Sequence, residues 1–580
     1  MGEPVNAGGM EPETIQRRFV TVTGRWGQRQ VHCRVGGSGP LLLLLHQSPQ
    51  SSRELLPLLR QWSHHFTVLA PDSPGYGLSD PLGVDEASLG DFAEATLEFL
   101  DAIGAGKFCV YGFHTGGMIG IALAERYPER VLGLACNGVA VPTAPEREEI
   151  LAEYLPAFEP RWDGSHLAWL WARIREQTIF FPWHIRTAAT RMSFPMPPPD
   201  RQQTSVLEFL RAADHYHVAY RAAFLYPVAD VVRTLRVPVL LTAAAWDPLY
   251  AHLARLTTAA PSVSIVPSAT AGEALERCLE FVLAHAGPSV TLQFACLRHD
   301  LRLWRDTVTV PGGTAHLLRG GPVGVPVLVL HEAGGSTETV RVLADALVDQ
   351  RTVLALDLPG HGEGDLQGAG AEASVAGGAV AALAVLDALN LPAVDVLGVE
   401  AGSCVALELA RIAPRRVRRV VMLDPPACEH GVADAIRDQG LPSLAPDWHG
   451  GHLSRCWHML RDGRLFFPWF RRDPQSIRPG EPELDNRRLQ LEVTERLKAE
   501  GSWQPLLASA LVQNIAEKLA TLEAEVALAA SAASPWYAGA AAVAVGAGRR
   551  FVALPPEPAH QRRAIAALFA GNGPLPGRDS

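Results

Sequence analysis

Residues 110–117 read VYGFHTGG, and this stretch decides the fold. An apolar run enters a turn bordered by glycines and a helical pattern follows, which is the frame of a nucleophile elbow. In such an elbow the third residue of G-x-S-x-G stands on a strained strand-to-helix turn, and the glycines permit the close backbone approach that exposes its side chain. Here the exposed position is His114 rather than a serine.

A second elbow follows in the other half of the chain. Residues 396–402 read VLGVEAG, so Glu400 takes the position that His114 takes in the first elbow. Neither elbow carries a hydroxyl nucleophile. Any chemistry at these two places must therefore come from an imidazole or a carboxylate.

The second half of the chain repeats the first at an offset of 285 to 288 residues. The repeat includes the histidines that end two aliphatic strands, His46 and His331, and the aromatic runs FFPW at 180–183 and 466–469. Many matches at one offset indicate duplication and fusion. We therefore predict two domains, residues 1–287 and residues 288–580.

Each half alternates short aliphatic runs with helical patterns. This rhythm predicts an α/β fold with a mostly parallel sheet covered by helices on both faces. In each half the rhythm is interrupted by a stretch rich in Trp, Phe, Pro and His, at about 143–230 and about 428–510. An insertion of this size predicts a helical lid over a site.

Composition limits the class of protein. The 580 residues include 51 basic and 61 acidic residues, a net charge of −10, which argues against nucleic-acid binding. The longest aliphatic run, residues 41–45, is too short to cross a membrane. Eight scattered cysteines without a C-x-x-C pair predict no zinc site and a reducing cytoplasm. We expect a cytoplasmic protein with no metal and no cofactor.

Both halves resemble the α/β-hydrolase superfamily over nearly their whole length. The resemblance rests on the elbows, on the turns DSPGYG at 72–77 and DLPGHG at 357–362, and on the late acid that follows a strand. The loops HQSP at 46–49 and HEA at 331–333, with the G-x-H-T-G elbow, are similar to those of a bacterial group of this superfamily.

The resemblance implies a triad in the order nucleophile, acid, histidine, and an oxyanion hole of two backbone N–H groups. It assigns the oxyanion donors to the backbones of Gln47 and Thr115 in the first half, and to those of Glu332 and Ala401 in the second. Backbone donors survive side-chain substitution, so this part of the site is expected to persist.

The triads themselves are incomplete. In the first half Asp247 holds the acid position, but PSATAG at 267–272 replaces the expected histidine loop. In the second half Pro535 stands at the acid position, Asp424 offers an alternative acid and His560 is the one late histidine. Neither half has a recognisable serine, cysteine or aspartate triad.

Two interpretations remain open for each elbow. His114 is either half of a His–Asp dyad, bonded directly to Asp247 and able to abstract a proton, or a packing relic. Glu400 is either a base or nucleophile that shares a proton with Asp424 or His560, or a salt-bridged remnant.

Aromatic and histidine side chains are the candidates for the pocket walls. They are His46, His166, Trp171 and Trp183 in the first half, and His331, His452, Trp457 and Trp469 in the second. The alternative is that the aromatic residues form the packed underside of the insertion helices.

The sequence thus predicts a hydrolase or lyase-like enzyme that acts on a small apolar ester or carbonyl compound through His114 and Asp247. The alternative from another class is a degenerate hydrolase that serves as a binding or scaffold protein, since fold does not decide function. A third arrangement is a catalytic first half stabilised by an inert second half. We expect a small-molecule ligand as the partner and the two halves packed as an internal pseudo-dimer.

Overall fold

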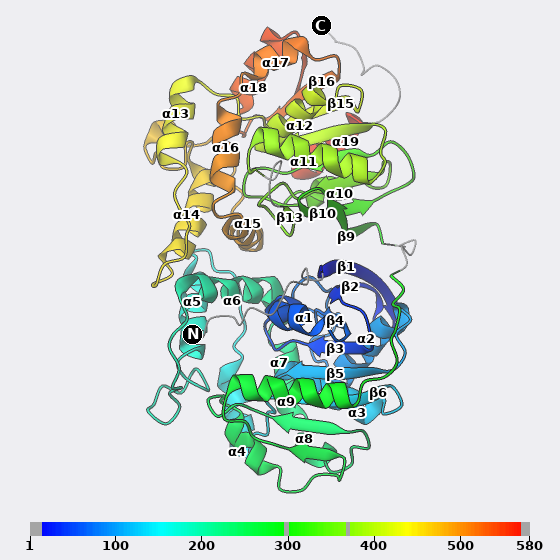
Figure 1. Ribbon diagram of the computed structural model, residues 1–580. Helices are drawn as coiled ribbons and strands as arrows, with labels where there is room; N and C mark the ends of the chain where they lie inside the picture. The colour runs from blue at the N-terminus through cyan, green and yellow to red at the C-terminus, as the bar shows by residue number, and fades with distance from the viewer. Residues whose placement is uncertain (1–13, 295–300, 367–371, 570–580) are drawn as a thin grey trace. The chain divides into compact units, whose positions relative to one another are not determined.

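The computed structural model describes residues 14–294, 301–366 and 372–569. Contacts divide the chain into two compact units, Met1–Glu159 with Leu170–Arg298, and Pro160–Trp169 with His299–Ser580. A mostly parallel β-sheet lies at the centre of each unit (Figure 1). The predicted α/β class, with one flanked sheet and one helical insertion in each half, is confirmed.

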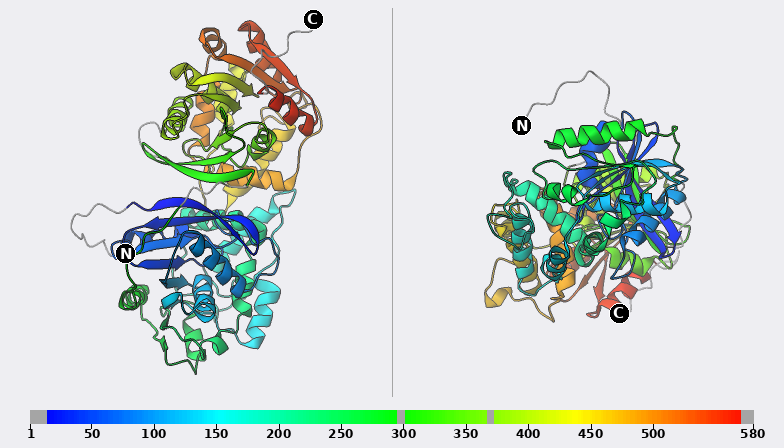
Figure 2. Two further views of the ribbon diagram at one scale, coloured as in Figure 1. Left: turned by 90° about the vertical axis from the view of Figure 1, so that its right-hand side faces the viewer. Right: turned by 90° about the horizontal axis from the view of Figure 1, so that it is seen from below.

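The first sheet has eight strands in the order β1-β2-β4-β3-β5-β6-β7-β8. Their bounds are β1 Gln16–Gly24, β2 Gly27–Gly36, β3 Leu41–Leu45, β4 Thr67–Pro71, β5 Phe108–Phe113, β6 Val131–Asn137, β7 Val239–Thr242 and β8 Val263–Ile265. β1 and β2 form the predicted antiparallel hairpin at the edge, drawn in blue in Figure 2. The neighbours from β4 to β8 pair in parallel, and all five leucines of β3 are buried because helices cover both faces.

The helices of the first half of the chain follow the βαβ rhythm. They are α1 Leu56–Trp62, α2 Leu89–Ala102, α3 Thr115–Arg126, α4 Ala144–Glu149, α5 Ser165–Gln177, α6 Pro199–Ala212, α7 Val218–Leu225, α8 Val228–Val231 and α9 Ala271–Ala284, with the short helical turns η1 Ser52–Leu55, η2 Ile150–Tyr154, η3 Ala213–His215 and η4 Tyr250–Arg255. Capping residues mark the helix starts. At the start of α2, the side chain of Ser88 accepts the backbone N–H of Asp91, and the side chain of Asp91 accepts the backbone N–H of Ser88. Helices α4 to α8 form the insertion between β6 and β7.

The second sheet has nine strands within the described residues, in the order β13-β10-β12-β11-β14-β15-β16-β17 with β9 paired to β10. Their bounds are β9 Leu303–Val310, β10 Gly313–Gly320, β11 Val327–Leu330, β12 Val353–Leu356, β13 Asp365–Leu366, β14 Val394–Val399, β15 Val417–Leu423, β16 Glu525–Ser531 and β17 Arg550–Leu554. The run from β12 to β17 is parallel, so this sheet repeats the first one.

The helices of the second half repeat the same plan. They are α10 Arg341–Leu347, α11 Val375–Ala388, α12 Ala401–Ile412, α13 His430–Gln439, α14 Gly451–Leu465, α15 Asn486–Lys498, α16 Trp503–Leu511, α17 Ile515–Thr521, α18 Tyr537–Gly546 and α19 Pro558–Ala567, with the short turn η5 Pro474–Ser476. Helices α13 to α17 form the insertion between β15 and β16, and α14 packs against α15 (Figure 1).

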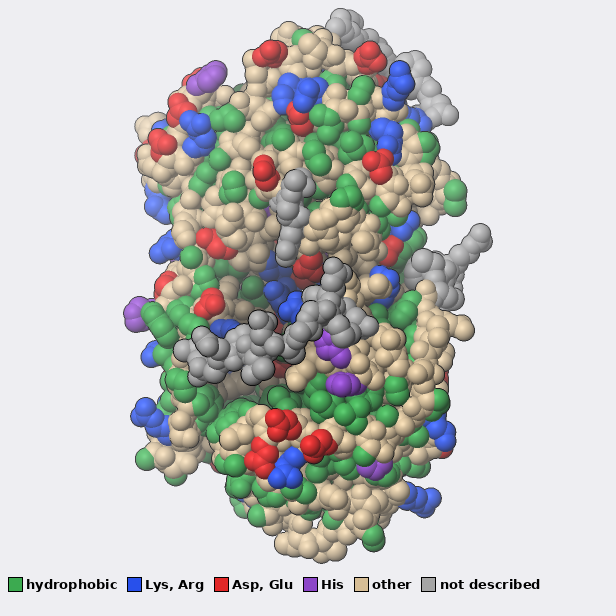
Figure 3. Space-filling view, in the orientation of Figure 1, with side chains coloured by type: hydrophobic (Ala, Val, Ile, Leu, Met, Phe, Trp, Pro, Cys, Tyr) green, Lys and Arg blue, Asp and Glu red, His purple; other side chains and the backbone are tan. Residues whose placement is uncertain are grey.

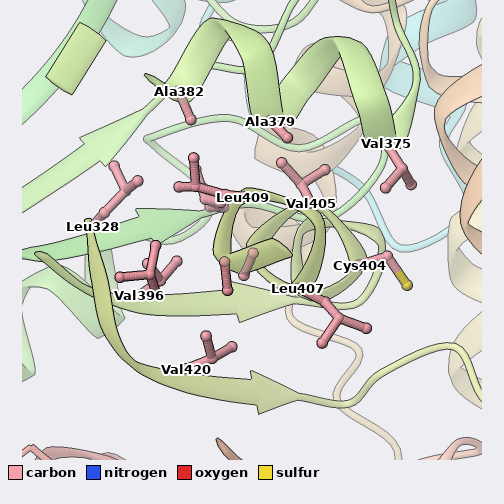
Figure 4. Close-up of a cluster of buried hydrophobic side chains, with 14 of the residues drawn as sticks. Leu328, Val375, Ala379, Ala382, Val396, Cys404, Val405, Leu407, Leu409 and Val420 are labelled. Atoms are coloured by element: carbon pink, nitrogen blue, oxygen red, sulfur yellow. The ribbon is translucent and has the colours of Figure 1, made fainter. Parts of the chain in front are cut away.

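The core of the second unit shows how the sheet is covered. Helices α11 and α12 pack on one face of it, and Figure 4 shows Ala379 and Val405 of these helices above Val396 and Val420 of the strands. Each fully buried valine or leucine of this kind contributes roughly 1.5–3 kcal/mol. The close packing holds the ends of the strands, and therefore the elbow, in place.

Charged side chains of both signs are interspersed over the face of the molecule shown in Figure 3. None of the helices within the described residues combines the length and the apolar composition needed to cross a membrane.

Both elbows have the backbone that their sequences predict. His114 and Glu400 have φ angles of 48° and 46°, in the left-handed region that side chains rarely adopt. Glycine is required next to them, because a Cβ on Gly112 would meet the backbone of Gly116 and Gly117, and one on Gly116 would meet Leu45 O. The turn therefore presents each elbow side chain at the carboxyl end of its sheet.

Candidate functional site

The first site lies at the carboxyl ends of β5 and β7, the two strands on either side of β6. His114 follows β5 and caps α3, while Asp247 lies in the turn after β7. His114 Nε2 lies 2.8 Å from Asp247 Oδ2, so the direct hydrogen bond of the dyad, one of the two interpretations of the sequence, is present. The imidazole also stacks on Phe113, with ring centroids 4.1 Å apart. These contacts hold the ring in one orientation.

The carboxyl of Asp247 is buried and still ionises readily. Burial acts to raise its pKa, but the neighbouring His114 and the backbone N–H of Leu249, which donates to Oδ1 at 2.8 Å, outweigh burial and hold the pKa below its usual value. An ionised Asp247 accepts a hydrogen bond from the Nε2–H of His114. In that tautomer Nδ1 is the basic atom of the ring.

His114 lines a cavity of about 310 Å³. The sheet end supplies Gln47, Thr115 and Met118, the insertion supplies Tyr154, Ile174, Phe181 and Tyr220, and the acid turn supplies Trp246 and Leu249. Among the described residues of this wall there is no aspartate, glutamate, lysine or arginine. The cavity is therefore mainly apolar, with an imidazole at one point of its wall.

One predicted oxyanion donor is already engaged. The backbone N–H of Gln47 donates to Oε1 of Glu54 at 2.7 Å, and its side-chain amide donates to Oε2 at 3.0 Å. Burial raises the pKa of Glu54 to about 8, although the bonds from Gln47 oppose the rise. The expectation that the Gln47 amide is open to substrate is thus corrected, whereas Thr115 begins α3 and lines the cavity.

Sequence reasoning missed Glu54. It lies in η1, seven residues after Gln47, and no motif marks it. One signal was available, because Glu54 is the only acidic residue between Leu41 and Pro71 and the aligned position of the second half is Thr339.

His46 and His331 do not line either cavity within the described chain. In each, Nδ1 donates to the carbonyl of the next residue and Nε2 accepts a backbone N–H, from Ser73 and Leu358 respectively. These histidines tie the strand ends to the D-x-P-G turns. Their predicted role as pocket walls is corrected to a structural one.

Of the other residues predicted as pocket walls, one lines a cavity and five are packed in the interior. Trp469 lines the cavity of the second unit. The side chains of the remaining ones are buried, and they do not reach either cavity in the described structure: His166, Trp171, Trp183, His452 and Trp457. For example, the indole N–H of Trp183 donates to Tyr154 O at 3.1 Å. Packing, the alternative from the sequence for the aromatic residues, fits the three tryptophans among them.

In the second unit, the carboxylate of Glu400 accepts hydrogen bonds from two nearby backbone N–H groups. Its Oε2 accepts the N–H of Ala333 at 3.3 Å, and the N–H of Ala401 also bonds to the carboxylate. The sequence predicts the backbone N–H groups of Glu332 and Ala401 as the donors of this half. The structure has the N–H of Ala401 and, in place of that of Glu332, the N–H of Ala333. Glu400 therefore occupies the place that a substrate oxyanion would take, and burial raises its pKa to about 7.

The other acids predicted for this half lie in different surroundings. Asp424 follows β15 and lines the same cavity as Glu400, and burial raises its pKa above the usual value. No hydrogen bond joins Asp424 to Glu400 in the described chain. His560 lies exposed on α19, 3.2 Å from Glu557 and outside the cavity wall. The predicted proton sharing of Glu400 with these residues is therefore not seen.

Comparisons with known proteins agree with this architecture. Residues 40–179 and 325–449 match the model of the family described as the alpha/beta hydrolase fold. The chain is 35% identical over 145 residues to fluoroacetate dehalogenase of a Burkholderia species, a stretch that covers 24% of this chain and 45% of that relative. It is 32% identical over 160 residues to 2-(acetamidomethylene)succinate hydrolase of Mesorhizobium japonicum, covering 27% of this chain and 54% of that relative.

The chain thus spans about half the length of these curated relatives. Among solved structures, a hydrolase of Pseudomonas aeruginosa aligns over 47% of this chain and 100% of its own, with a TM-score of 0.37 and 20% identity. The two matched regions and the two sheets show that the chain contains two tandem α/β-hydrolase folds, one in each half.

Proposed function

We propose that the first unit is a cofactor-free hydrolase, or a lyase-like enzyme, that acts on a small apolar ester or carbonyl compound. The observation that carries the proposal is the 2.8 Å bond between His114 and Asp247 at the wall of a mainly apolar cavity. An oriented imidazole beside a buried carboxylate is suited to general base catalysis. The hydrolase names of the relatives support the same class.

For an ester, the chemistry follows from this geometry. Nδ1 of His114 takes a proton from a water molecule as the water oxygen attacks the carbonyl carbon, and the C=O electron pair moves to the oxygen. The N–H of Thr115, at the start of α3, is the proposed donor to that oxyanion. When the tetrahedral intermediate collapses, the C–O bond to the alcohol breaks and the imidazolium returns the proton to the leaving oxygen.

The alternative is a catalytically degenerate protein that binds a ligand in the same cavity. One observation favours it, namely that Glu54 engages the Gln47 amide and leaves the oxyanion with fewer donors. Loss of a single oxyanion donor costs about 10²–10³ in kcat. A slow hydrolase and a binding protein are therefore the two functions to separate.

The test is hydrolysis of short-chain aryl esters, thioesters and lactones by the purified protein and by single variants. We expect His114→Ala and Asp247→Asn to lower kcat/KM by about 100-fold or more, because the base is lost or held in the wrong tautomer. Glu400→Ala, in the other unit, is the matched control and should keep the wild-type rate. Equal, negligible rates in all four proteins would reject His114 as the base and favour the binding protein.

A further inference from the structure

The cavity of the second unit has a different chemical character from that of the first. Its volume is about 530 Å³, against about 310 Å³ for the first cavity. Five acidic side chains and four arginines line it: Glu332, Glu400, Asp424, Glu483, Glu492, Arg464, Arg478, Arg488 and Arg496. Aromatic rings complete the wall, among them Trp469 and Trp536. The duplication has therefore produced two pockets of different polarity.

Part of this charge is neutralised within the protein. Glu492 accepts from Arg464 at 2.5 Å and from Arg488 at 2.9 Å. Arg488 also donates to the carbonyl of Thr339 at 3.0 Å. These groups form a closed ion-pair network, so they do not require a ligand.

Other charged groups around the same cavity are left incomplete. Arg478 and Arg496 each have a buried Nε without a hydrogen-bond partner, and Asp424 has a buried Oδ1 without one. Arg496 lies over the ring of Trp503, with its guanidinium carbon 4.5 Å from the ring centroid. Arg496 interacts electrostatically with Glu400, and Arg478 with Asp424, but within the described chain no hydrogen bond or ion pair joins either arginine to either acid.

Buried charges of this kind are costly unless something pairs with them. A neutral apolar ligand would displace water from all of them and replace none of its hydrogen bonds. An anion would satisfy the arginines but would be repelled by Asp424 and Glu400, and a cation would have the reverse problem. A ligand that carries both charges satisfies both sets.

We propose that the second unit binds a small zwitterion of the amino-acid class with an apolar side chain. Arg496 receives the carboxylate of the ligand, Asp424 receives its ammonium group, and the apolar side chain packs against the indoles of Trp469 and Trp536. This proposal concerns a cavity separate from His114 and does not depend on hydrolysis there.

The test uses the intact protein and four matched forms of one ligand. L-Leucine carries both charges, N-acetyl-L-leucine only the negative one, L-leucinamide only the positive one, and N-acetyl-L-leucinamide neither. The same four forms of phenylalanine make a second series. Titration calorimetry, with thermal shift at millimolar ligand, should show binding of the amino acid. Blocking either end should weaken the affinity about tenfold or more, the loss expected for one charged hydrogen-bonded contact.

Variants locate the site. Asp424→Asn and Arg496→Gln should each weaken amino-acid binding by about tenfold or more, with the Asn variant losing mainly the preference for a free ammonium group. His114→Asn, in the first unit, is the matched control and should bind with wild-type affinity. Melting temperatures check that the variants are folded. The comparison of the four ligand forms uses the unaltered protein, so it tests the proposal even if a variant does not fold.

Three results would overturn the proposal. The first is that neither amino acid binds at millimolar concentration. The second is that the doubly blocked form binds as tightly as the amino acid, because the charges would then contribute nothing. The third is that His114→Asn abolishes binding while Asp424→Asn and Arg496→Gln leave it unchanged, which would move the ligand to the first cavity.

Discussion

The carboxylate of Glu54 accepts both the backbone N–H and the side-chain amide of Gln47, at 2.7 Å and 3.0 Å. In the proposed hydrolase this backbone N–H would otherwise serve the substrate. We therefore expect Glu54→Ala to release the donor and to raise kcat/KM for aryl esters about tenfold or more.

Glu54→Gln is the control for that prediction. Its amide oxygen keeps an acceptor for the Gln47 N–H, so the rate should stay near wild type. The measurement is steady-state ester hydrolysis by the three proteins, with melting temperatures to compare their folding. Equal rates for the alanine and glutamine variants would show that the Gln47 amide takes no part.

Gly138 determines where the imidazole of His114 lies. It has a φ angle of 83°, and a Cβ at this position would collide with Cδ2 and Nε2 of the ring. We expect Gly138→Ala to push the ring away from Asp247 and to lower esterase kcat/KM about 100-fold.

Gly83→Ala separates this collision from backbone strain. Gly83 has a similar φ angle of 72°, but a Cβ there meets nothing within 4 Å. Both variants should lose about 1 kcal/mol of stability from the left-handed backbone. Only Gly138→Ala should lose activity, and an equal loss in both would contradict the steric explanation.

The buried pair of His32 and Asp72 makes the first unit sensitive to acid. Burial lowers the pKa of His32 to about 4, whereas an unfolded histidine titrates near 6.5. Between these values the unfolded chain binds more protons, so stability falls as the pH falls from about 6.5 to about 4, by up to roughly 3 kcal/mol. Burial acts to raise the pKa of Asp72, but His32 outweighs it and holds the pKa well below the usual value, so its stabilising contribution is lost at still lower pH.

Hydrogen exchange followed by mass spectrometry on peptides from β2 and β4 measures this local stability. His32→Gln should remove most of the pH dependence between about 6.5 and 4, because glutamine does not titrate. An unchanged slope in that variant would assign the acid sensitivity to other groups.

Glu400 predicts the opposite dependence for the second unit. Burial raises its pKa to about 7, so the folded chain holds the proton over a range where the unfolded chain has lost it. Stability should therefore fall as the pH rises from about 4.5 to about 7. Glu400→Gln should match wild type near pH 5 and exceed it near pH 8, by up to about 3 kcal/mol. Thermal unfolding at the two pH values checks this, and a difference that does not change with pH would count against it.

Much of the fold could be predicted from the sequence because its patterns are local and occur in both halves of the chain. The five leucines of β3 predict a buried strand, and the glycines around His114 and Glu400 predict a strained turn between strand and helix. The offset of 285 residues between His46 and His331 predicts that the second half has the same fold. The contact of His114 with Asp247 was one of two interpretations of the sequence, since the carboxyl ends of β5 and β7 lie at one edge of the sheet.

The cavities were less predictable. Trp171, Trp183 and Trp457 look like pocket walls in sequence, yet only the packing of the insertion helices decides that they face inward. Arg496 of α15 reaches the cavity of the second unit, and no motif in the sequence marks it. Helical periodicity tells which side chains share a face but not what that face covers.

The sequence by itself determined two α/β folds and two elbows without a hydroxyl nucleophile. These features depend on strand order, glycine positions and the alternation of apolar residues, which local sequence patterns encode. Tertiary structure alone decided that Glu54 engages the Gln47 amide, that Glu400 lies on the N–H groups of Ala333 and Ala401, and that His560 stays exposed. Such contacts join groups from separate elements, and their distances depend on packing that no local pattern encodes.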